Sequence, residues 1–350
     1  MTCYSPDALA KIRAMFDVPE MRFAGQNAVF AESLILAGTG PELFLQSKII
    51  PGSVVLRSTY RERDRNCIIY EEGRDYAVDY GNGALCRTAD SRIPDYCDHV
   101  FYGKDKFDHR DAADFGNVRF TVYCDYAFAA NETPVLLFKP ADRLFPPCFA
   151  KKQITAGIIG DSITFGCDAT VTERSYAWSW AAMLEKKYAQ NSFRVYNKAL
   201  GGMASGWGVT AFERELAPIK PDIVLIGFGM NDQNVNPSDG IATPPEKFRE
   251  NIEAMCALAE KSNPDVLITL VAPMLTNPRW CFTSGRLPEL RAILQGIAAD
   301  NGYFFADVTS LWEKMLARKS FASLACNNVN HPNDFGHWVY TEVVRAATLG

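Results

Sequence analysis

The chain has 350 residues, of which 48% are hydrophobic and 22% are charged, and its formal net charge is −5. This length and composition are typical of a globular protein with room for two domains. The negative net charge and the absence of clustered Lys and Arg argue against binding to nucleic acid or to an anionic membrane surface. We therefore expect a small or neutral substrate.

The N-terminal residues, MTCYSPDALAKIRAMFDVPEM, do not show a basic region followed by an apolar one, and no stretch has the length of a membrane span. These features predict a cytoplasmic protein that does not bind membranes. The ten cysteines are scattered without a CxxC pair or a metal-ligand spacing, which favours reduced thiols. No nucleotide-binding motif of the G-x-G-x-x-G or G-x-x-x-x-G-K-[ST] type is present, and we expect no cofactor.

Residues 1–145 are predicted to form a β-rich accessory domain that begins with a short helix near residues 5–16. Between about residues 50 and 140, short segments separated by turns predict strands: SVVLRSTY, NCIIYEEG, YAVDYGNGALCR, VRFTVYCDYAF and PVLLFKP. The stretch DYGNGALCR contains a candidate hairpin turn. The aromatic and β-branched content favours an antiparallel sandwich like that of carbohydrate-binding domains, with aromatic side chains that fill its core rather than line a groove.

The segment LFPPCFAKKQ, residues 144–153, is the predicted linker to a second domain at residues 151–350. In this domain, unbroken apolar runs alternate with amphipathic stretches, as in a parallel sheet with crossover helices. The runs are ITAGIIG, FRVYN, DIVLIGFG, VLITLVAP and YFFADV. The predicted helices are SYAWSWAAMLEKKYA, PEKFRENIEAMCALAEK, LPELRAILQGIAADN and FGHWVYTEVVRAATL. The sequence thus predicts a three-layer α/β fold with five parallel strands.

Ligands of open parallel sheets bind beyond the carboxyl ends of the strands, so the residues that follow each run are the candidates for a site. Ser162 follows the first run in GDSITFG, Gly202 follows the second in NKALGGMAS, and Asn231 follows the third in GFGMNDQ. His331 lies near the C-terminus in NNVNHPNDFGH. These four residues are the candidate site.

Together these residue types supply the parts of an acyl-transfer site. A serine in a tight turn before a helix exposes its hydroxyl and offers its own backbone N–H to an oxyanion. Gly202 lets a second N–H approach closely, and Asn231 adds an uncharged donor. His331 is expected to take the proton of Ser162 and return it to the leaving alkoxide. Asp161 and Asp232 are interpreted as turn and helix caps, and His337 as a structural residue.

These motifs resemble the conserved blocks of the SGNH hydrolases, also called the GDSL esterase or lipase family. The matching residues are Gly160, Asp161 and Ser162 in the first block, Gly202 in the second, Gly229, Asn231 and Asp232 in the third, and His331 in the last. The resemblance covers about residues 151–350. It implies the flavodoxin-like SGNH fold, a Ser162 nucleophile with a His331 base, and an oxyanion hole formed by Ser162, Gly202 and Asn231.

One position departs from the family pattern, because Asn328 stands three residues before His331 where the family has aspartate. An asparagine can offer only its carbonyl oxygen to the Nδ1 proton of the imidazole. We predict that Asn328 orients His331. A backbone carbonyl, or Asp334 reaching back across the turn, are the alternatives.

The sequence also suggests a metal site, since His331, Asp334 and His337 form an H-x-x-D-x-x-H series. No HExxH motif and no further ligand cluster accompany it, and we expect no bound metal. The predicted function is that of a serine esterase acting on short-chain or O-acetyl esters of a carbohydrate or small molecule. A thioesterase or lysophospholipase, and a glycan-binding protein with a weakened site, are the alternatives, and the sequence leaves the oligomeric state open.

Overall fold

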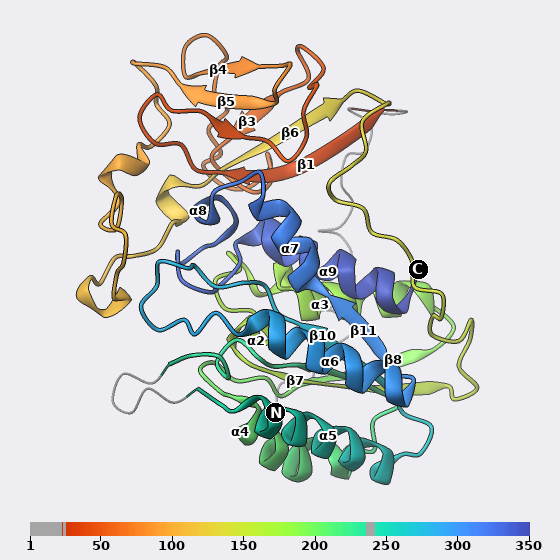
Figure 1. Cartoon of the computed structure of the whole chain (residues 1–350). Coiled ribbons are helices and arrows are strands. Elements are labelled where there is room, and N and C mark those ends of the chain that lie inside the picture. Colours follow the sequence, from red (N-terminus) through yellow and green to blue (C-terminus); the bar gives the residue numbers. More distant parts are fainter. Residues whose placement is uncertain (1–22, 24–25, 236–241) are drawn as a thin grey trace.

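The computed structural model describes residues 23, 26–235 and 242–350. The helix predicted near residues 5–16 lies outside these residues. Figure 1 shows an N-terminal region of antiparallel strands at the top and a C-terminal α/β domain below it. The fold therefore has the two predicted parts, a β-rich one and a parallel α/β one.

The C-terminal domain is built on a five-stranded parallel sheet with the order β11-β10-β9-β7-β8. Its strands are β7 (Gln153–Gly160), β8 (Ser192–Asn197), β9 (Ile223–Gly227), β10 (Leu267–Ala272) and β11 (Phe304–Asp307). All five coincide with the predicted apolar runs. The chain goes from β7 to β8 on one side and then crosses to β9 on the other side of β7. This change of direction opens a crevice at the carboxyl ends of β7 and β9, where ligands of such sheets bind.

Helices cover both faces of this sheet because its strands are apolar on both faces. Along β9, Ile223 and Leu225 belong to one hydrophobic cluster, and Val224 and Ile226 to the other. The first face packs against α3 (Tyr176–Lys187), α7 (Val308–Leu316) and α9 (Asp334–Thr348), and the second against α4 (Ser205–Ala211), α5 (Pro245–Ser262) and α6 (Leu287–Asn301). The helices α3, α5, α6 and α9 are those that the sequence predicts.

The N-terminal region contains two three-stranded antiparallel sheets. One has the order β1-β6-β3, from β1 (Asn27–Leu34), β6 (Val122–Phe128) and β3 (Val55–Arg57). The other has the order β2-β5-β4, from β2 (Glu42–Leu43), β5 (Ala84–Arg87) and β4 (Tyr76–Asp79). The predicted hairpin is confirmed, since β4 and β5 pair with Asp79 opposite Ala84. The Asp79 carboxylate accepts the N–H groups of Gly81 and Asn82 in the turn.

Two expectations for this region were wrong, and one strand was not expected. PVLLFKP, residues 134–140, forms no strand, because the prolines at its ends cannot donate to a ladder and its apolar side chains pack on the core instead. Residues 66–73 provide only isolated bridges, including one between Ile69 and Arg57. The strand β1 was not predicted, because a register shift between Val29 and Glu32 interrupts its alternation.

The two parts share one hydrophobic core. The larger cluster of buried residues includes Leu34 and Tyr126 of the N-terminal region together with Leu324 and Val339 of the C-terminal domain. The predicted linker also packs, since the Phe145 ring lies 4.7 Å from that of Phe304 and the Phe145 N–H donates to the Thr348 carbonyl at 2.8 Å. Phe145 and Phe149 of the segment 144–153 thus pack on the core, so the segment is not a free tether.

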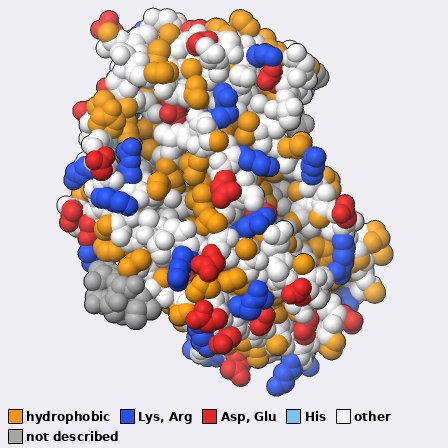
Figure 2. Space-filling view, in the orientation of Figure 1, with side chains coloured by type: hydrophobic (Ala, Val, Ile, Leu, Met, Phe, Trp, Pro, Cys, Tyr) orange, Lys and Arg blue, Asp and Glu red, His pale blue; other side chains and the backbone are white. Residues whose placement is uncertain are grey.

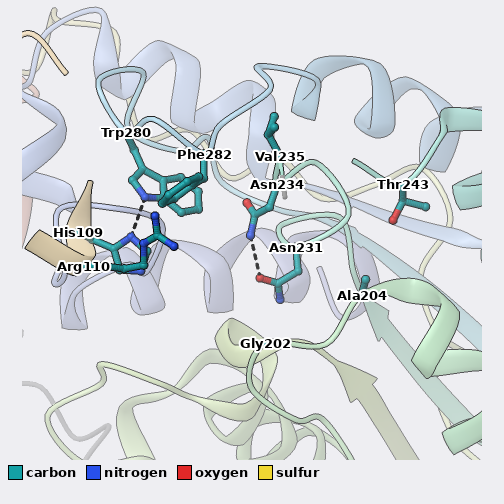
Figure 3. Close-up of a pocket in the computed structure, with 10 residues that line it drawn as sticks. All are labelled: His109, Arg110, Gly202, Ala204, Asn231, Asn234, Val235, Thr243, Trp280 and Phe282. Atoms are coloured by element: carbon teal, nitrogen blue, oxygen red, sulfur yellow. Dashed lines mark hydrogen bonds between the residues drawn. The ribbon is translucent and has the colours of Figure 1, made fainter. Parts of the chain in front are cut away.

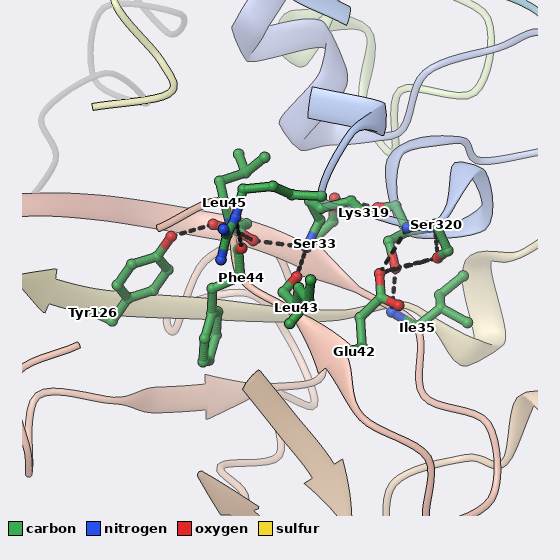
Figure 4. Close-up of polar contacts among 12 residues, drawn as sticks. Ser33, Ile35, Glu42, Leu43, Phe44, Leu45, Tyr126, Lys319 and Ser320 are labelled. Carbon is green, nitrogen blue, oxygen red and sulfur yellow. Dashed lines mark hydrogen bonds and ion pairs between the residues drawn. The ribbon is translucent and has the colours of Figure 1, made fainter. Parts of the chain in front are cut away.

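A buried ion pair joins the two parts as well (Figure 4). The Lys319 ammonium, just beyond α7, lies 2.7 Å from the Glu32 carboxylate of β1, and both side chains are fully buried. Glu32 also accepts the N–H of Leu45 at 2.9 Å and the hydroxyl of Tyr126. Lys319 donates further to the Leu43 carbonyl at 3.1 Å. The charges are therefore paired and hydrogen-bonded, as burial requires.

The surface in Figure 2 carries basic and acidic side chains interspersed with apolar ones. Over the residues that the structure describes, none of the helices combines the length and the apolar character needed to cross a membrane. Every cysteine in this part of the chain is free.

Candidate active site

The turn between β7 and α2 (Ser162–Phe165) positions Ser162. Asp161 accepts the N–H of Ile163 at 3.0 Å and so caps this short helix. A Cβ atom at Gly160 would lie 2.4 Å from the Gly227 carbonyl oxygen, so only glycine allows the turn to pack against β9. Because α2 has a single turn, its dipole favours an oxyanion less than the sequence suggested, and the backbone N–H of Ser162 is the relevant donor.

His331 is presented by a loop that an asparagine side chain organises. The Asn327 Oδ1 atom accepts the N–H groups of Val329, Asn330 and His331 at 3.0, 2.9 and 3.0 Å. The imidazole Nε2 atom lies 2.8 Å from the Ser162 Oγ atom. The structure thus brings together the serine of the first block and the histidine of the last.

Asp168, and not the predicted Asn328, is the hydrogen-bond partner of the His331 Nδ1 atom. Its Oδ2 atom lies 2.8 Å from the Nδ1 atom of His331. Asn328 is turned elsewhere, with φ of +56°, and its backbone and side-chain oxygens accept the Nδ2 group of Asn277 at 2.8 and 3.3 Å. The expectation that Asn328 orients His331 is therefore wrong, and a carboxylate rather than an amide completes the Ser–His–acid series.

The loop that carries Asp168 is held by the first turns of α9. Asp334 accepts the N–H and the hydroxyl of Thr170 at 2.9 and 2.5 Å, so it does not reach back to His331. Asp334 also pairs with Arg174 at 2.9 Å. The His337 Nε2 group donates to the Cys167 carbonyl at 3.1 Å, and burial lowers the pKa of His337 to about 4, which keeps its ring neutral.

These contacts explain the H-x-x-D-x-x-H series, because each of its three side chains binds a residue of the segment 162–170. His331 binds Ser162 and Asp168, Asp334 binds Thr170, and His337 binds the Cys167 carbonyl. In the described part of the chain, no group of three or more His, Cys, Asp or Glu side chains is placed to bind a metal ion. Sequence reasoning missed Asp168 because no motif marks it. Its only signal is an acidic residue six positions after the serine, in a Gly-flanked turn.

The candidate oxyanion donors are the backbone N–H groups of Ser162 and Gly202 and the side-chain amide of Asn231. Gly202 has φ of +77°, and a Cβ at the preceding Gly201 would lie 3.8 Å from the Ser162 Cβ atom. The Asn231 amide accepts from Asn234 at 3.2 Å (Figure 3). It also donates to the Met203 carbonyl at 3.0 Å, and the two hydrogen bonds fix its orientation. Within the described residues, the backbone N–H groups of Ser162 and Gly202 donate to no protein atom. They are therefore available to an incoming oxygen.

Asp161 and Asp232 lie beneath the site and act as caps, as interpreted from the sequence. Asp232 accepts the N–H and the hydroxyl of Ser205 at 3.0 and 2.5 Å and so holds the start of α4. Burial raises the pKa of Asp161 to about 7 and that of Asp232 in the same direction. Neither carboxylate takes a hydrogen bond from His331.

A cavity of about 400 Å³ opens beside the oxyanion donors (Figure 3). Gly202 and Asn231 border it on the side of the catalytic domain. His109 and Arg110, which belong to the N-terminal region, border it on the opposite side, and Phe282 lies between them. Its volume lies in the range of ligand sites, roughly 300 to 1,000 Å³.

The fold and this site define a class of protein. A serine, a histidine and a carboxylate in hydrogen-bonding sequence, at the switch point of a parallel sheet, form a Ser–His–Asp triad on a doubly wound α/β fold. The model of the GDSL-like Lipase/Acylhydrolase family matches residues 158–339, more than half of the chain. The protein belongs to this family.

The individual relatives described below are 20–27% identical to this chain. Esterase TesA of Pseudomonas aeruginosa is 27% identical over 133 residues, which cover 37% of this chain and 61% of that protein. The chain thus matches about three fifths of the length of this relative. Among solved structures, a two-domain esterase active on acetylated mannans is 23% identical, with a TM-score of 0.45 over 55% of this chain and 48% of that one. The acetylxylan esterase Axe2 of Geobacillus stearothermophilus is 20% identical, with a TM-score of 0.45 over 55% of this chain and 92% of that one.

Proposed function

We propose that the protein hydrolyses carboxylic esters through an acyl-enzyme formed on Ser162. The observation that carries this proposal is the continuous hydrogen-bonded series from Ser162 to His331 to Asp168, at 2.8 Å for each step. Membership of the acylhydrolase family and the likeness to Esterase TesA support it.

Each catalytic group has one task. Ser162 Oγ forms a bond to the acyl carbon as its proton passes to His331 Nε2, and Asp168 stabilises the imidazolium through Nδ1. The negative charge on the acyl oxygen is held by the N–H groups of Ser162 and Gly202 and by the Asn231 amide. When the tetrahedral intermediate collapses, the alkoxide leaves with the proton from His331.

Deacylation reverses these roles. A water molecule loses its proton to His331 Nε2 as its oxygen attacks the acyl carbon. The bond to Ser162 Oγ then breaks and the serine recovers the proton, which releases the carboxylic acid. Loss of a single oxyanion donor is expected to lower kcat by about 10²–10³, so Asn231→Ala tests that part of the site.

The acyl group is proposed to be short, with O-acetyl groups on a carbohydrate or small molecule as the leading substrates. The cavity beside Gly202 and Asn231 has a volume of about 400 Å³, which supports a small substrate next to the oxyanion donors. The glycan-binding alternative rests on Asn328 as a weak partner of His331 and on the sandwich-like first domain, and the first of these grounds does not hold because Asp168 is the partner of His331. A carboxylate at Nδ1 stabilises the imidazolium by its charge, which supports hydrolysis over binding alone.

Two measurements on the full chain test the proposal. A fluorophosphonate should label the native protein and not Ser162→Ala. p-Nitrophenyl esters of increasing acyl length should be hydrolysed with the highest kcat/KM for acetyl. Native protein that is neither labelled nor active on any of these esters would contradict the proposal.

A further inference from the structure

A segment of the N-terminal region reaches the candidate active site. This segment, residues 96–117 and called the arm below, leaves the N-terminal strands and runs down beside the C-terminal domain in Figure 1 as gold loops. Its residues His109 and Arg110 border the cavity next to Asn231 (Figure 3). The N-terminal region therefore supplies part of the cavity wall.

The arm is fixed where it meets the catalytic domain. The Phe107 N–H donates to the Arg279 carbonyl at 3.0 Å, and the Cys281 N–H donates to the Phe107 carbonyl at 3.1 Å. The rings of Phe101 and Phe107 stack at 4.4 Å and form a buried cluster with Trp280 and Val329. Because Val329 lies two residues before His331, the arm packs directly against the loop of the candidate base.

His109 presents a neutral donor to the cavity. The Trp280 indole N–H can only donate, and it donates to His109 Nδ1 at 3.0 Å. The proton of a neutral His109 ring must therefore be on Nε2. Burial lowers the pKa of His109, which favours this neutral form.

The positive charge of Arg110 is paired with the carboxylate of Asp108. Its guanidinium lies 4.6 Å from the centre of the Phe282 ring, and the Asp108 carboxylate binds its Nε and Nη2 groups at 3.0 and 2.6 Å. The Nη1 group has no partner in the part of the chain that the structure describes. The Arg–Asp pair thus offers a fixed donor edge and acceptor oxygens without net charge.

The other lining residues that the structure describes are uncharged. Asn231 and Asn234 contribute amides, and Phe282 contributes an apolar ring beside them. An anionic group such as the phosphates of coenzyme A or of a lysophospholipid would find no unpaired cation among the described lining residues. Hydroxyl groups on an apolar ring face match this mixture of donors, acceptors and aromatic surface.

We infer that His109 and Arg110 form a subsite that binds the alcohol part of the ester, and that this part is an uncharged polyhydroxylated group such as a sugar ring. The inference rests on the proposed esterase function and specifies its substrate class. In this arrangement the N-terminal region selects the alcohol while the catalytic domain performs the chemistry.

The test compares substrates that share an acetyl group and differ in the leaving group, which is a sugar alcohol, a phenol or a thiol. A monoacetylated methyl xyloside with free hydroxyls, p-nitrophenyl acetate and acetyl-CoA are assayed with the native chain and with Arg110→Ala. The ratio of kcat/KM for the xyloside to that for p-nitrophenyl acetate should fall about tenfold or more in Arg110→Ala, as expected when a hydrogen bond to a charged group is lost.

The chain offers a matched control in Arg119→Ala. The Arg119 guanidinium also lies over an aromatic ring, at 4.5 Å from the centre of Phe120, and its side chain is similarly exposed at 59% against 57% for Arg110. It does not border the cavity. The same substrate ratio should remain unchanged in Arg119→Ala. Arg110→Lys, which keeps the charge but loses the planar fork, should fall between the native chain and Arg110→Ala.

Three results would overturn the inference. These are an unchanged substrate ratio in Arg110→Ala, an equal loss on both acetyl esters, and a native preference for acetyl-CoA over the xyloside. A native chain that is inactive on p-nitrophenyl acetate and unlabelled by a fluorophosphonate would instead contradict the proposed function itself.

Discussion

At the scale of single residues, the candidate triad depends on an acid that comes from the nucleophile's own loop. Asp168 and Ser162 both follow β7, and His331 reaches them from the far end of the chain. Replacing Asp168 by Asn should lower kcat by about 10³–10⁴ with little change in KM, since the amide favours the wrong imidazole tautomer. Steady-state kinetics on p-nitrophenyl acetate measure this effect.

Asn328→Gly is the matched control for Asp168→Asn. Glycine tolerates the left-handed backbone at this position, and the backbone oxygen that accepts from Asn277 is retained. kcat should stay within about twofold of the native value, because the Asn328 side chain makes no contact with His331. A large loss in Asn328→Gly together with an unaffected Asp168→Asn would reverse the assignment.

The site residues divide into those that sequence could locate and one that it could not. Ser162, Gly202 and Asn231 each follow a strand of the parallel sheet, so strand prediction alone brings them to one edge. Asp168 follows no strand end of its own, and its position depends on how residues 166–170 fold against α9. Such tertiary contacts leave no local pattern in the sequence.

Asp161 provides a residue-scale prediction for stability. Burial raises its pKa from an unfolded value of about 4 to about 7, so the folded state binds a proton that the unfolded state has released between these pH values. Below about pH 4 the carboxyl is protonated in both states, and the free energy of unfolding has its full value. As the pH rises from about 4 to about 7, the free energy of unfolding falls by up to roughly 1.4 kcal/mol per pH unit. Asp161→Asn should remove this pH dependence while keeping the cap on Ile163.

Urea unfolding at several pH values between 4 and 8 measures the difference. The free energies of unfolding of the native chain and of Asp161→Asn should diverge with pH across this window. Parallel curves would show that the Asp161 carboxyl does not titrate there.

At the scale of elements, α9 and the loop after α2 act as one unit. Thr170 donates both its N–H and its hydroxyl to the buried Asp334, and this fixes the segment that carries Asp168. Thr170→Val keeps the shape and removes the hydroxyl bond, which should cost about 1.5–3 kcal/mol of stability. kcat should fall as well, because Asp168 is less precisely placed.

A double-mutant cycle separates these two effects. In an Asp168→Asn background, Thr170→Val should lower stability by the same amount but should no longer lower kcat. An undiminished loss of kcat in the double variant would mean that Thr170 acts on the site by another route.

Sequence pattern predicted the elements of the C-terminal domain well and those of the N-terminal region poorly, for a physical reason. Strands buried on both faces, such as β9, appear as short continuous apolar runs, and their alternation with amphipathic stretches marks them as strands of a parallel sheet. β1 instead carries the buried charge of Glu32 and an irregular register, so neither alternation nor an apolar run marks it. The side chains of Glu32 and Ser33 in β1 bind Lys319 and Ser323, which lie almost 300 residues away in the chain.

At the scale of the whole molecule, the two parts are expected to unfold together. The larger hydrophobic cluster contains side chains from both parts, and the linker residue Phe145 is buried in it. Thermal unfolding followed by far-UV and near-UV circular dichroism should therefore give coincident single transitions. Two separated transitions would show that the shared core does not couple the parts.

The Lys319–Glu32 pair gives the sharpest test of this coupling. Lys319→Met leaves the Glu32 carboxylate buried without its cation, which should cost about 3–5 kcal/mol. The double variant Lys319→Met with Glu32→Gln removes both charges, and it should recover much of this loss because no unpaired charge remains. Urea unfolding of the native chain, of Lys319→Met, of Glu32→Gln and of the double variant measures the loss of stability in Lys319→Met and its recovery in the double variant. Since Glu32 lies in β1 and Lys319 beyond α7, a coupling energy near zero in this cycle would mean that this ion pair does not help to hold the N-terminal region to the catalytic domain.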